Sequence, residues 1–249
     1  MRLIKARVQN YRSVIDTGYF DVESNKTILV GPNEAGKTAV LQALQKLNPP
    51  KGTPLFNALR DYPRSKYNDL SKGRIDPANV CVVEGHFQIE ANDLEGLSEE
   101  YYSSIFVFSR NLDNSENGYI KDGPPLLTYG ELVKDLKRMA AHVDSRIKNS
   151  QEPDNPVLLP SVTLSSITED FQENTYISIE KANSLSTWLE GIYTYIDENN
   201  KTEEERYDKL KTSLTRPVEQ DAVYNRCKNL IPVFVYFNNY FRVKPLIHL

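Results

Sequence analysis

The stretch Gly31-Pro-Asn-Glu-Ala-Gly-Lys-Thr38 decides the interpretation of this chain. It fits the pattern G-x-x-x-x-G-K-[ST], in which a glycine-rich loop folds its backbone amides around phosphate groups. In such a loop Lys37 reaches the β- and γ-phosphates, and the Thr38 hydroxyl ligates Mg²⁺. The sequence therefore predicts that the chain binds ATP together with Mg²⁺.

The residues on both sides of the loop have the character that a phosphate-binding loop requires. Residues 26–30 predict a strand that leads into the loop, and Val40, Leu41 and Leu44 recur at helical spacing after it. Pro49-Pro50 ends this helix, whose N-terminal partial positive charge favours an anion. Glu34 is unfavourable in a phosphate cradle, so we expect its carboxylate to point outward.

The rest of the first 127 residues predicts an α/β lobe. Strands are expected at residues 3–8, 18–22, 80–89 and 104–109, with a turn at Asn10-Tyr-Arg-Ser13 and an irregular segment at residues 51–77.

The chain changes character after residue 127. Thr128 and Glu131 have capping-box spacing and predict a helix over residues 129–148, followed by a proline-rich linker at 151–160. Further helices are expected from 166 to 228 and a strand at 232–237. We therefore expect an ATPase lobe at 1–127, a helical insertion or arm at 128–230, and a return strand of the lobe at 231–249. The apolar end of the sequence suggests a truncated fragment.

The first 48 residues resemble the N-terminal half of SMC/RecF-type ATPase heads, with residues 3–14, the Asn10-Tyr-Arg-Ser13 turn and the phosphate loop in the same order. They are most similar to the OLD (overcoming lysogenization defect) family and the related Gabija ATPase-nucleases. The resemblance implies an α/β P-loop ATPase of the ABC/SMC-like head type, with a mixed sheet and a helical insertion or arm. It also places the arginine of the turn, Arg12, beside the nucleotide phosphates.

We expect the nucleotide to contact a set of residues from the turn and the loop, with Lys37 catalytic and Thr38 as the metal ligand. This set is Arg12, Gly31, Pro32, Asn33, Glu34, Ala35, Gly36, Lys37, Thr38 and Ala39.

The resemblance also implies partners. Heads of this type sandwich ATP between two copies, so we expect a homodimer or a larger homo-oligomer. OLD proteins carry a C-terminal TOPRIM nuclease domain, which this sequence does not contain, and we expect DNA to be reached through the intact protein.

Two motifs of the family, a Walker B strand ending in carboxylates and a serine-glycine signature, have no convincing counterpart. Residues 192–198 end in Asp197-Glu198 but continue a helical face, and the strand expected at 234–237 ends in Asn238-Asn239, where amides cannot serve as a base. A GTPase interpretation rests on residues 93–96 and 200–203. Asp93 has the character of a helix cap and Asn200 is expected to follow a helix, so ATP is favoured.

The composition limits the remaining functions. With 30 Lys+Arg against 34 Asp+Glu, the chain lacks the charge of a DNA-coating protein. Basic residues between 51 and 74, interleaved with Phe56, Tyr62 and Tyr67, could meet nucleic acid, but a solvated loop is favoured. The two cysteines are expected to be packing residues, the three histidines have no metal-ligand spacing, and no membrane segment or secretory signal is found. A cytoplasmic location is expected.

Three hypotheses remain open from the sequence. The first is the ATPase head of an OLD-like DNA-processing or anti-phage defence nuclease. The second is an SMC/RecF-like DNA-repair clamp head. The third is a nucleotide-sensing module that does not hydrolyse ATP.

Overall fold

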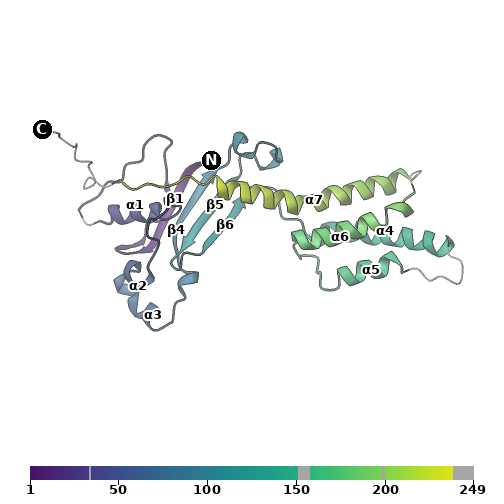
Figure 1. The fold of residues 1–249 in the computed structure, drawn as a ribbon, viewed down its shortest axis with the longest axis horizontal. Helices are drawn as coiled ribbons and strands as arrows, with labels where there is room; N and C mark the ends of the chain where they lie inside the picture. Colours follow the sequence, from purple (N-terminus) through teal and green to yellow (C-terminus); the bar gives the residue numbers. More distant parts are fainter. Residues whose placement is uncertain (34, 151–157, 198–199, 238–249) are drawn as a thin grey trace. The chain divides into compact units, whose positions relative to one another are not determined.

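The computed structural model describes residues 1–33, 35–150, 158–197 and 200–237, with the side chain of residue 150 left out (Figure 1). The chain divides into two compact units. Unit 1 consists of Met1–Gly123 and Val223–Leu249, and unit 2 of Pro124–Ala222. The last helix, α7 (Lys201–Asn229), contributes residues to both.

Unit 1 is built on a six-stranded sheet with the order β2-β1-β4-β5-β6, and β3 also pairs with β1. The strands are β1 (Arg2–Tyr11), β2 (Val14–Asp16), β3 (Phe20–Asp21), β4 (Cys81–Gln88), β5 (Ile105–Asn111) and β6 (Glu116–Lys121). The strands expected at residues 3–8, 80–89 and 104–109 are confirmed as β1, β4 and β5. Only β3 forms within the strand expected at 18–22, and β6 was not predicted.

The sheet differs from the expected mixed sheet, because every ladder among the described strands is antiparallel. The strand expected at residues 26–30 is not formed. Ile28 and Val30 are 65% and 91% exposed, and of these apolar side chains only Leu29 packs against the core. The segment before the phosphate loop therefore lacks the cross-strand packing that stabilises a strand.

The two faces of the sheet have different chemistry. The register aligns Ala6 with Gly85 and Gly85 with Phe108, and this face forms the main core of unit 1. The neighbouring positions Arg7 and Glu84 lie on the other face, which is largely polar. Such an alternation is typical of an antiparallel sheet covered on one side.

Helix α1 (Lys37–Gln45) covers the apolar face and buries Ala39, Val40 and Ala43 against β1 and β4 (Figure 1). The helix predicted after the phosphate loop is therefore confirmed. A Cβ atom at Gly85 would lie within 3.0 Å of the side chains of Leu47, Leu3 and Phe87. The missing side chain at Gly85 thus allows the chain just after α1 to approach the sheet closely.

The segment expected to be irregular contains short helices, α2 (Ala58–Asp61), η1 (Arg64–Lys66), α3 (Tyr67–Ser71) and η2 (Pro77–Asn79). Two more, η3 (Ala91–Leu94) and η4 (Glu99–Tyr101), lie between β4 and β5. Phe56 and Tyr62 are buried in the core, so they are not available to stack on bases, while Lys66 donates to Asn10 Oδ1 at 2.9 Å. These contacts favour the structural interpretation of the basic segment.

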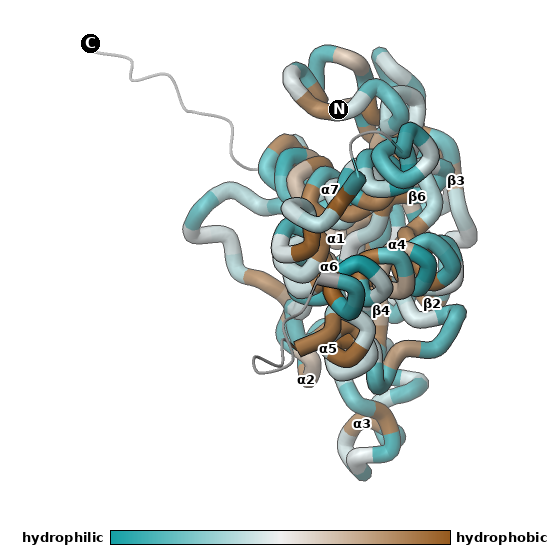
Figure 2. The backbone as a smooth tube through the Cα atoms, turned by 90° about the vertical axis from the view of Figure 1, so that its right-hand side faces the viewer, coloured by the Kyte–Doolittle hydropathy of each residue, from teal (hydrophilic) through white to brown (hydrophobic). Residues whose placement is uncertain are grey.

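Unit 2 is helical. It contains α4 (Tyr129–Ser150), α5 (Pro160–Ile167), α6 (Ile179–Gly191), η5 (Tyr193–Tyr195) and the part of α7 up to residue 222. The helix predicted over 129–148 is confirmed as α4, and the Glu131 carboxylate accepts from the Thr128 amide at 3.1 Å, one half of the expected capping box. The apolar residues along α5 are visible in Figure 2, and Leu164 joins the core of this unit. Most of the linker expected at 151–160 lies outside the described residues.

Residues 231–237, the described part of the expected return strand, do not form a strand. Within residues 232–237, the Phe234 amide donates to the Asn48 carbonyl oxygen at 2.9 Å, and Phe234 packs on the core of unit 1. Asn238, Asn239 and the apolar end of the chain lie outside the described residues. Among the helices described, none is both long and apolar enough to cross a bilayer.

Candidate phosphate-binding site

The site begins at Gly36, the residue that caps the N-terminus of α1. Its φ of 86° lies in the left-handed region, which favours glycine. A Cβ atom there would meet Val14 Cγ2 at 3.1 Å and Ser13 Oγ at 3.2 Å, so both conformation and space exclude a side chain. The phosphate loop and the turn after β1 therefore approach each other at a point where only glycine fits without strain.

Beside this contact lies a cavity of about 410 Å³. Its volume falls within the range of about 300–1,000 Å³ usual for small-molecule sites. The lining combines two cationic side chains with hydroxyl and amide groups, and the described residues that form it include no carboxylate. These residues are Arg12, Ser13, Asn33, Gly36, Lys37, Thr38, Ala39 and Gln42.

The first turn of α1 supplies further donors to the cavity. The first bond inside the helix runs from the Val40 amide to the Gly36 carbonyl oxygen, at 3.0 Å. The preceding amides, including those of Thr38 and Ala39, have no partner within the helix, as at any helix N-terminus. The first turn contains no acidic residue. These amides and the helix dipole therefore favour an anion at this position.

Lys37 closes the loop on itself. Its ammonium group donates to the carbonyl oxygens of Gly31 at 2.6 Å and Pro32 at 2.7 Å. Both acceptors are neutral, and the described residues give this ammonium group no ion pair with a carboxylate. Because charge-assisted hydrogen bonds are the stronger ones, a phosphate oxygen could compete for this ammonium group.

Arg12 is the second cation of the lining and comes from the turn after β1. Its Nη1 atom donates to Gln42 Oε1 at 2.5 Å, and its Nε atom to Asp61 Oδ1 at 3.3 Å. The guanidinium carbon lies 5.0 Å from the centre of the Tyr11 ring. Arg12 is thus held in one orientation from three directions while it lines the cavity.

The structure brings six residues of the expected site around this cavity: Arg12, Asn33, Gly36, Lys37, Thr38 and Ala39. Gly31 and Pro32 contribute their carbonyl oxygens to Lys37, and Ala35 donates its amide to Pro32 O at 3.3 Å. Glu34 and its expected outward orientation lie outside the described residues. Ser13 and Gln42 were not predicted. Ser13 belongs to the quoted turn, and Gln42 lies one helical turn after Thr38, on the side of α1 that faces the cavity.

The hydrogen-bond donors and the hydroxyl that line the cavity suit a nucleoside triphosphate with Mg²⁺. Lys37, Arg12 and the free amides suit phosphate oxygens, and the exposed Thr38 hydroxyl suits a hard cation. No other group of three or more His, Cys, Asp or Glu side chains within the described ranges could hold a metal ion.

The motifs that imitate other ATPase and GTPase elements have structural roles. Asp93 is the third residue of η3 and completes a capping box with Glu90, which is the actual cap. The Asn200 side chain accepts a hydrogen bond from the Glu203 amide and caps the start of α7. Asn200 was expected to follow a helix, and here it precedes one. Residues 193–195 form η5 after α6, so no Walker B strand exists there, and Glu198 lies outside the described residues.

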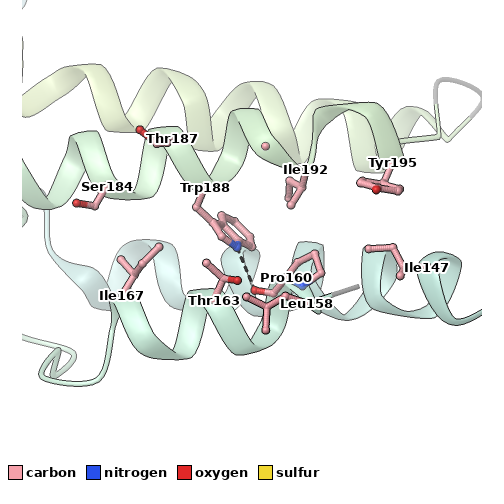
Figure 3. A pocket seen from close by; sticks show the side chains of 11 residues that line it. Ile147, Leu158, Pro160, Thr163, Ile167, Ser184, Thr187, Trp188, Ile192 and Tyr195 are labelled. Atoms are coloured by element: carbon pink, nitrogen blue, oxygen red, sulfur yellow. Dashed lines mark hydrogen bonds between the residues drawn. The ribbon is translucent and has the colours of Figure 1, made fainter. Parts of the chain in front are cut away.

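A second cavity, of about 400 Å³, lies in unit 2 between α5 and α6 (Figure 3). Its lining is mainly apolar and includes Ile167, Ile192 and Trp188, whose indole Nε1 donates to the Pro160 carbonyl oxygen at 3.0 Å. None of the described residues that line it is charged. This cavity therefore does not suit a phosphate group, and the cavity beside α1 is the candidate nucleotide site.

A comparison with known protein families identifies the class of the domain. The family model of the AAA ATPase domain matches residues 1–230. A comparison with curated proteins gave no match. The family match covers nearly the whole chain and includes both the phosphate loop and the helices of unit 2. The chain therefore belongs to the AAA ATPase domain family and is a P-loop ATPase domain.

Proposed function

We propose that this chain is the ATP-binding and ATP-hydrolysing head of an OLD-like nuclease that acts in DNA processing or anti-phage defence. The observation that supports ATP binding is the cavity lined by Arg12, Lys37 and the first turn of α1. The family match supports the ATPase class. The OLD-like role is supported by the similarity of the first 48 residues to heads of that type.

In this proposal each residue of the cavity has a separate task. Lys37 leaves the carbonyl oxygens of Gly31 and Pro32 and donates to the phosphates, which the first-turn amides also bind. Arg12 adds a second positive charge to the lining. Thr38 presents its hydroxyl to Mg²⁺, and a bound Mg²⁺ would neutralise part of the charge on the phosphates.

The proposed partners follow from the same chemistry. Hydrolysis needs a carboxylate or another group that orients the attacking water. The described lining offers cations, amides and hydroxyls for binding. We therefore propose that two copies bind around ATP and Mg²⁺, each completing the site of the other, and that DNA and a nuclease domain are engaged through the intact protein.

A second candidate is a nucleotide-sensing module that binds ATP without hydrolysing it. The same lining favours it, because the described groups around the cavity are all suited to binding an anion. Steady-state turnover at a saturating ATP concentration separates the two candidates. A rate of phosphate release per chain that depends on Mg²⁺ and rises with protein concentration supports a dimeric ATPase. ATP binding without turnover supports the sensor.

The experiment that tests the proposal is isothermal titration of the chain with ATP and Mg²⁺. Lys37→Ala is expected to weaken binding by at least about tenfold, since it removes a charge-assisted contact. Lys51→Ala is the control, because Lys51 is an exposed lysine outside the cavity lining. Equal affinity in the wild type and Lys37→Ala would contradict ATP binding at this loop.

A further inference from the structure

Asp61 is a fully buried carboxylate at the end of α2, and it connects three parts of unit 1. Its Oδ2 atom accepts from Lys46 Nζ at 2.9 Å and from the Asn57 amide at 3.0 Å. Its Oδ1 atom accepts from Arg12 Nε at 3.3 Å and from Arg60 Nε at 3.4 Å. One carboxylate thus contacts the turn after β1, the residue that follows α1 and its own segment.

The backbone reinforces the link between Asp61 and Arg12. The Arg12 amide donates to the Asp61 carbonyl oxygen at 2.6 Å, and Arg12 has a φ of 52°, in the left-handed region that few side chains adopt. A residue in this conformation persists only when its surroundings hold it there. Asp61 therefore fixes both the backbone and the side chain of Arg12.

Lys46 connects Asp61 to α1, the helix that follows the phosphate loop. It lies directly after α1, the helix that begins with Lys37, and it also donates to the Leu55 carbonyl oxygen at 3.0 Å. Lys46 and Asp61 are both buried, so their positions are tightly determined by packing. The carboxylate consequently sets the position of Arg12 relative to α1 and the cavity.

We propose that Asp61 is the positioning residue of the phosphate site: it holds the Arg12 guanidinium at the cavity, ready to bind a phosphate group. This inference rests on the proposed function. Asp61 does not line the cavity, so its effect on the nucleotide passes through Arg12. Residues 55–60, which precede Asp61, therefore support the site through Asp61.

The chain contains an internal control for this inference. Arg60 binds the same Oδ1 atom of Asp61, but its side chain is 65% exposed and does not line the cavity. Removal of Arg60 therefore perturbs the surroundings of Asp61 without removing a cation from the cavity. Removal of Arg12 deletes the group that Asp61 is proposed to position.

A double-mutant cycle measured by titration with ATP and Mg²⁺ tests the proposal. Arg12→Ala is expected to weaken binding by about tenfold, and Asp61→Asn by about five- to tenfold in the wild-type background. In the Arg12→Ala background, Asp61→Asn is expected to change the affinity by less than about twofold, because the two residues act through one contact. Arg60→Ala is expected to stay within about twofold of the wild type.

A role in stability alone gives a different pattern. An equal loss of affinity from Asp61→Asn in both backgrounds, or no loss in either, would overturn the inference. If Lys37→Ala also left binding unchanged, the proposed ATP site itself would fail, so the two failures are distinguishable.

Asp61→Asn removes the counter-charge of buried Lys46, and folding is therefore checked by urea unfolding of each variant. If the single variant does not fold, Lys46→Met combined with Asp61→Asn removes both charges of the buried pair. The same cycle with Arg12→Ala is then measured in that background, where Asp61→Asn is compared with Lys46→Met alone. Additive losses there would equally overturn the inference.

Discussion

Lys46 Nζ lies 2.9 Å from Asp61 Oδ2, and both side chains are buried at the point where the end of α1 meets α2. Burial lowers the pKa of Lys46, although its bond to Asp61 works in the opposite direction. Burial also tends to raise the pKa of Asp61, but the Asn57 amide and Lys46 outweigh it and leave the pKa below its usual value. Each of the two charged forms is therefore stabilised by the other.

The first prediction concerns the stability of this pair. Asp61→Ala leaves the Lys46 ammonium group buried without its counter-charge, and we expect the free energy of unfolding to fall by about 3–5 kcal/mol. Urea denaturation at pH 7 measures this loss. Asp69→Ala is the control, since its ion pair with Arg74 is exposed and contributes about 1 kcal/mol or less. Equal losses from the two variants would show that burial of the Lys46–Asp61 pair is unimportant.

The second prediction concerns Gly36. Alanine at this position must adopt a φ near 86° and approach Val14 and Ser13 within 3.2 Å, so we expect a cost above the roughly 1–2 kcal/mol of the left-handed conformation alone. Gly52 is the matched control, because its φ is 84° and nothing lies near its Cβ position. Gly52→Ala should therefore lose only the stability that the left-handed conformation costs, and it should keep its ATP affinity. Gly36→Ala should lose more stability and also lose ATP affinity. Equal thermal stabilities of the two variants would refute the steric part of this argument.

The third prediction separates metal binding from phosphate binding. Thr38→Ala removes the hydroxyl proposed to ligate Mg²⁺, so most of the gain in ATP affinity that Mg²⁺ confers should disappear, while affinity without Mg²⁺ should change little. Thr38→Ser retains the hydroxyl and should behave as the wild type. Titration with ATP, with and without Mg²⁺, measures both quantities. A Thr38→Ser variant as defective as Thr38→Ala would indicate that the methyl group matters and the hydroxyl does not.

The fourth prediction concerns Tyr11, whose hydroxyl is buried without a hydrogen-bond partner among the described residues. Burial raises its pKa to about 12. Tyr11→Phe removes the cost of this desolvated hydroxyl, so the free energy of unfolding should rise by about 1 kcal/mol. Tyr176→Phe, at an exposed position, is the control and should change it little. A loss of stability in Tyr11→Phe would instead indicate that the hydroxyl has a hydrogen-bond partner, such as the neighbouring Arg12 guanidinium.

The fifth prediction concerns pH. Burial raises the pKa of the Cys227 thiol to about 11, from a usual value of 9.0. The thiol stays protonated in the folded state but ionises in the unfolded state above pH 9, so its contribution to stability is complete below about pH 9 and is lost as the pH rises toward 11.

Urea denaturation of the wild type and Cys227→Ala at pH 8 and pH 11 measures this contribution. The difference in unfolding free energy between them should shrink by roughly 2 kcal/mol, since one pKa unit corresponds to about 1.4 kcal/mol. A difference that stays constant over this range would contradict burial of the thiol.

The elements closest to the phosphate loop were predictable because their signals are local. The motif with Lys37 and Thr38 is contiguous, and the helical spacing of Val40 and Leu44 continues directly from it. Strand β4 was equally predictable, since its apolar residues are buried in the sheet. In these segments local preference and tertiary packing agree.

The remaining features depend on contacts between distant residues. Residues 26–30 have strand composition but no strand partner, and β6 was missed because an edge strand that begins Glu116-Asn-Gly lacks a clear apolar alternation. Asp61 lies 49 residues from Arg12 in the sequence, and no spacing rule joins them. The phosphate loop could thus be recognised from sequence, whereas the contact between Asp61 and Arg12 could not.

Gly85 in β4 has a consequence for engineering this domain. The sheet supports α1, and the absence of a side chain at position 85 leaves room for Leu47, the residue that follows this helix by two positions. Any larger residue there would require the side chains of Leu47, Leu3 and Phe87 to shift. Redesign of the domain interior should therefore keep glycine at this strand position, although it lies far in sequence from the phosphate loop.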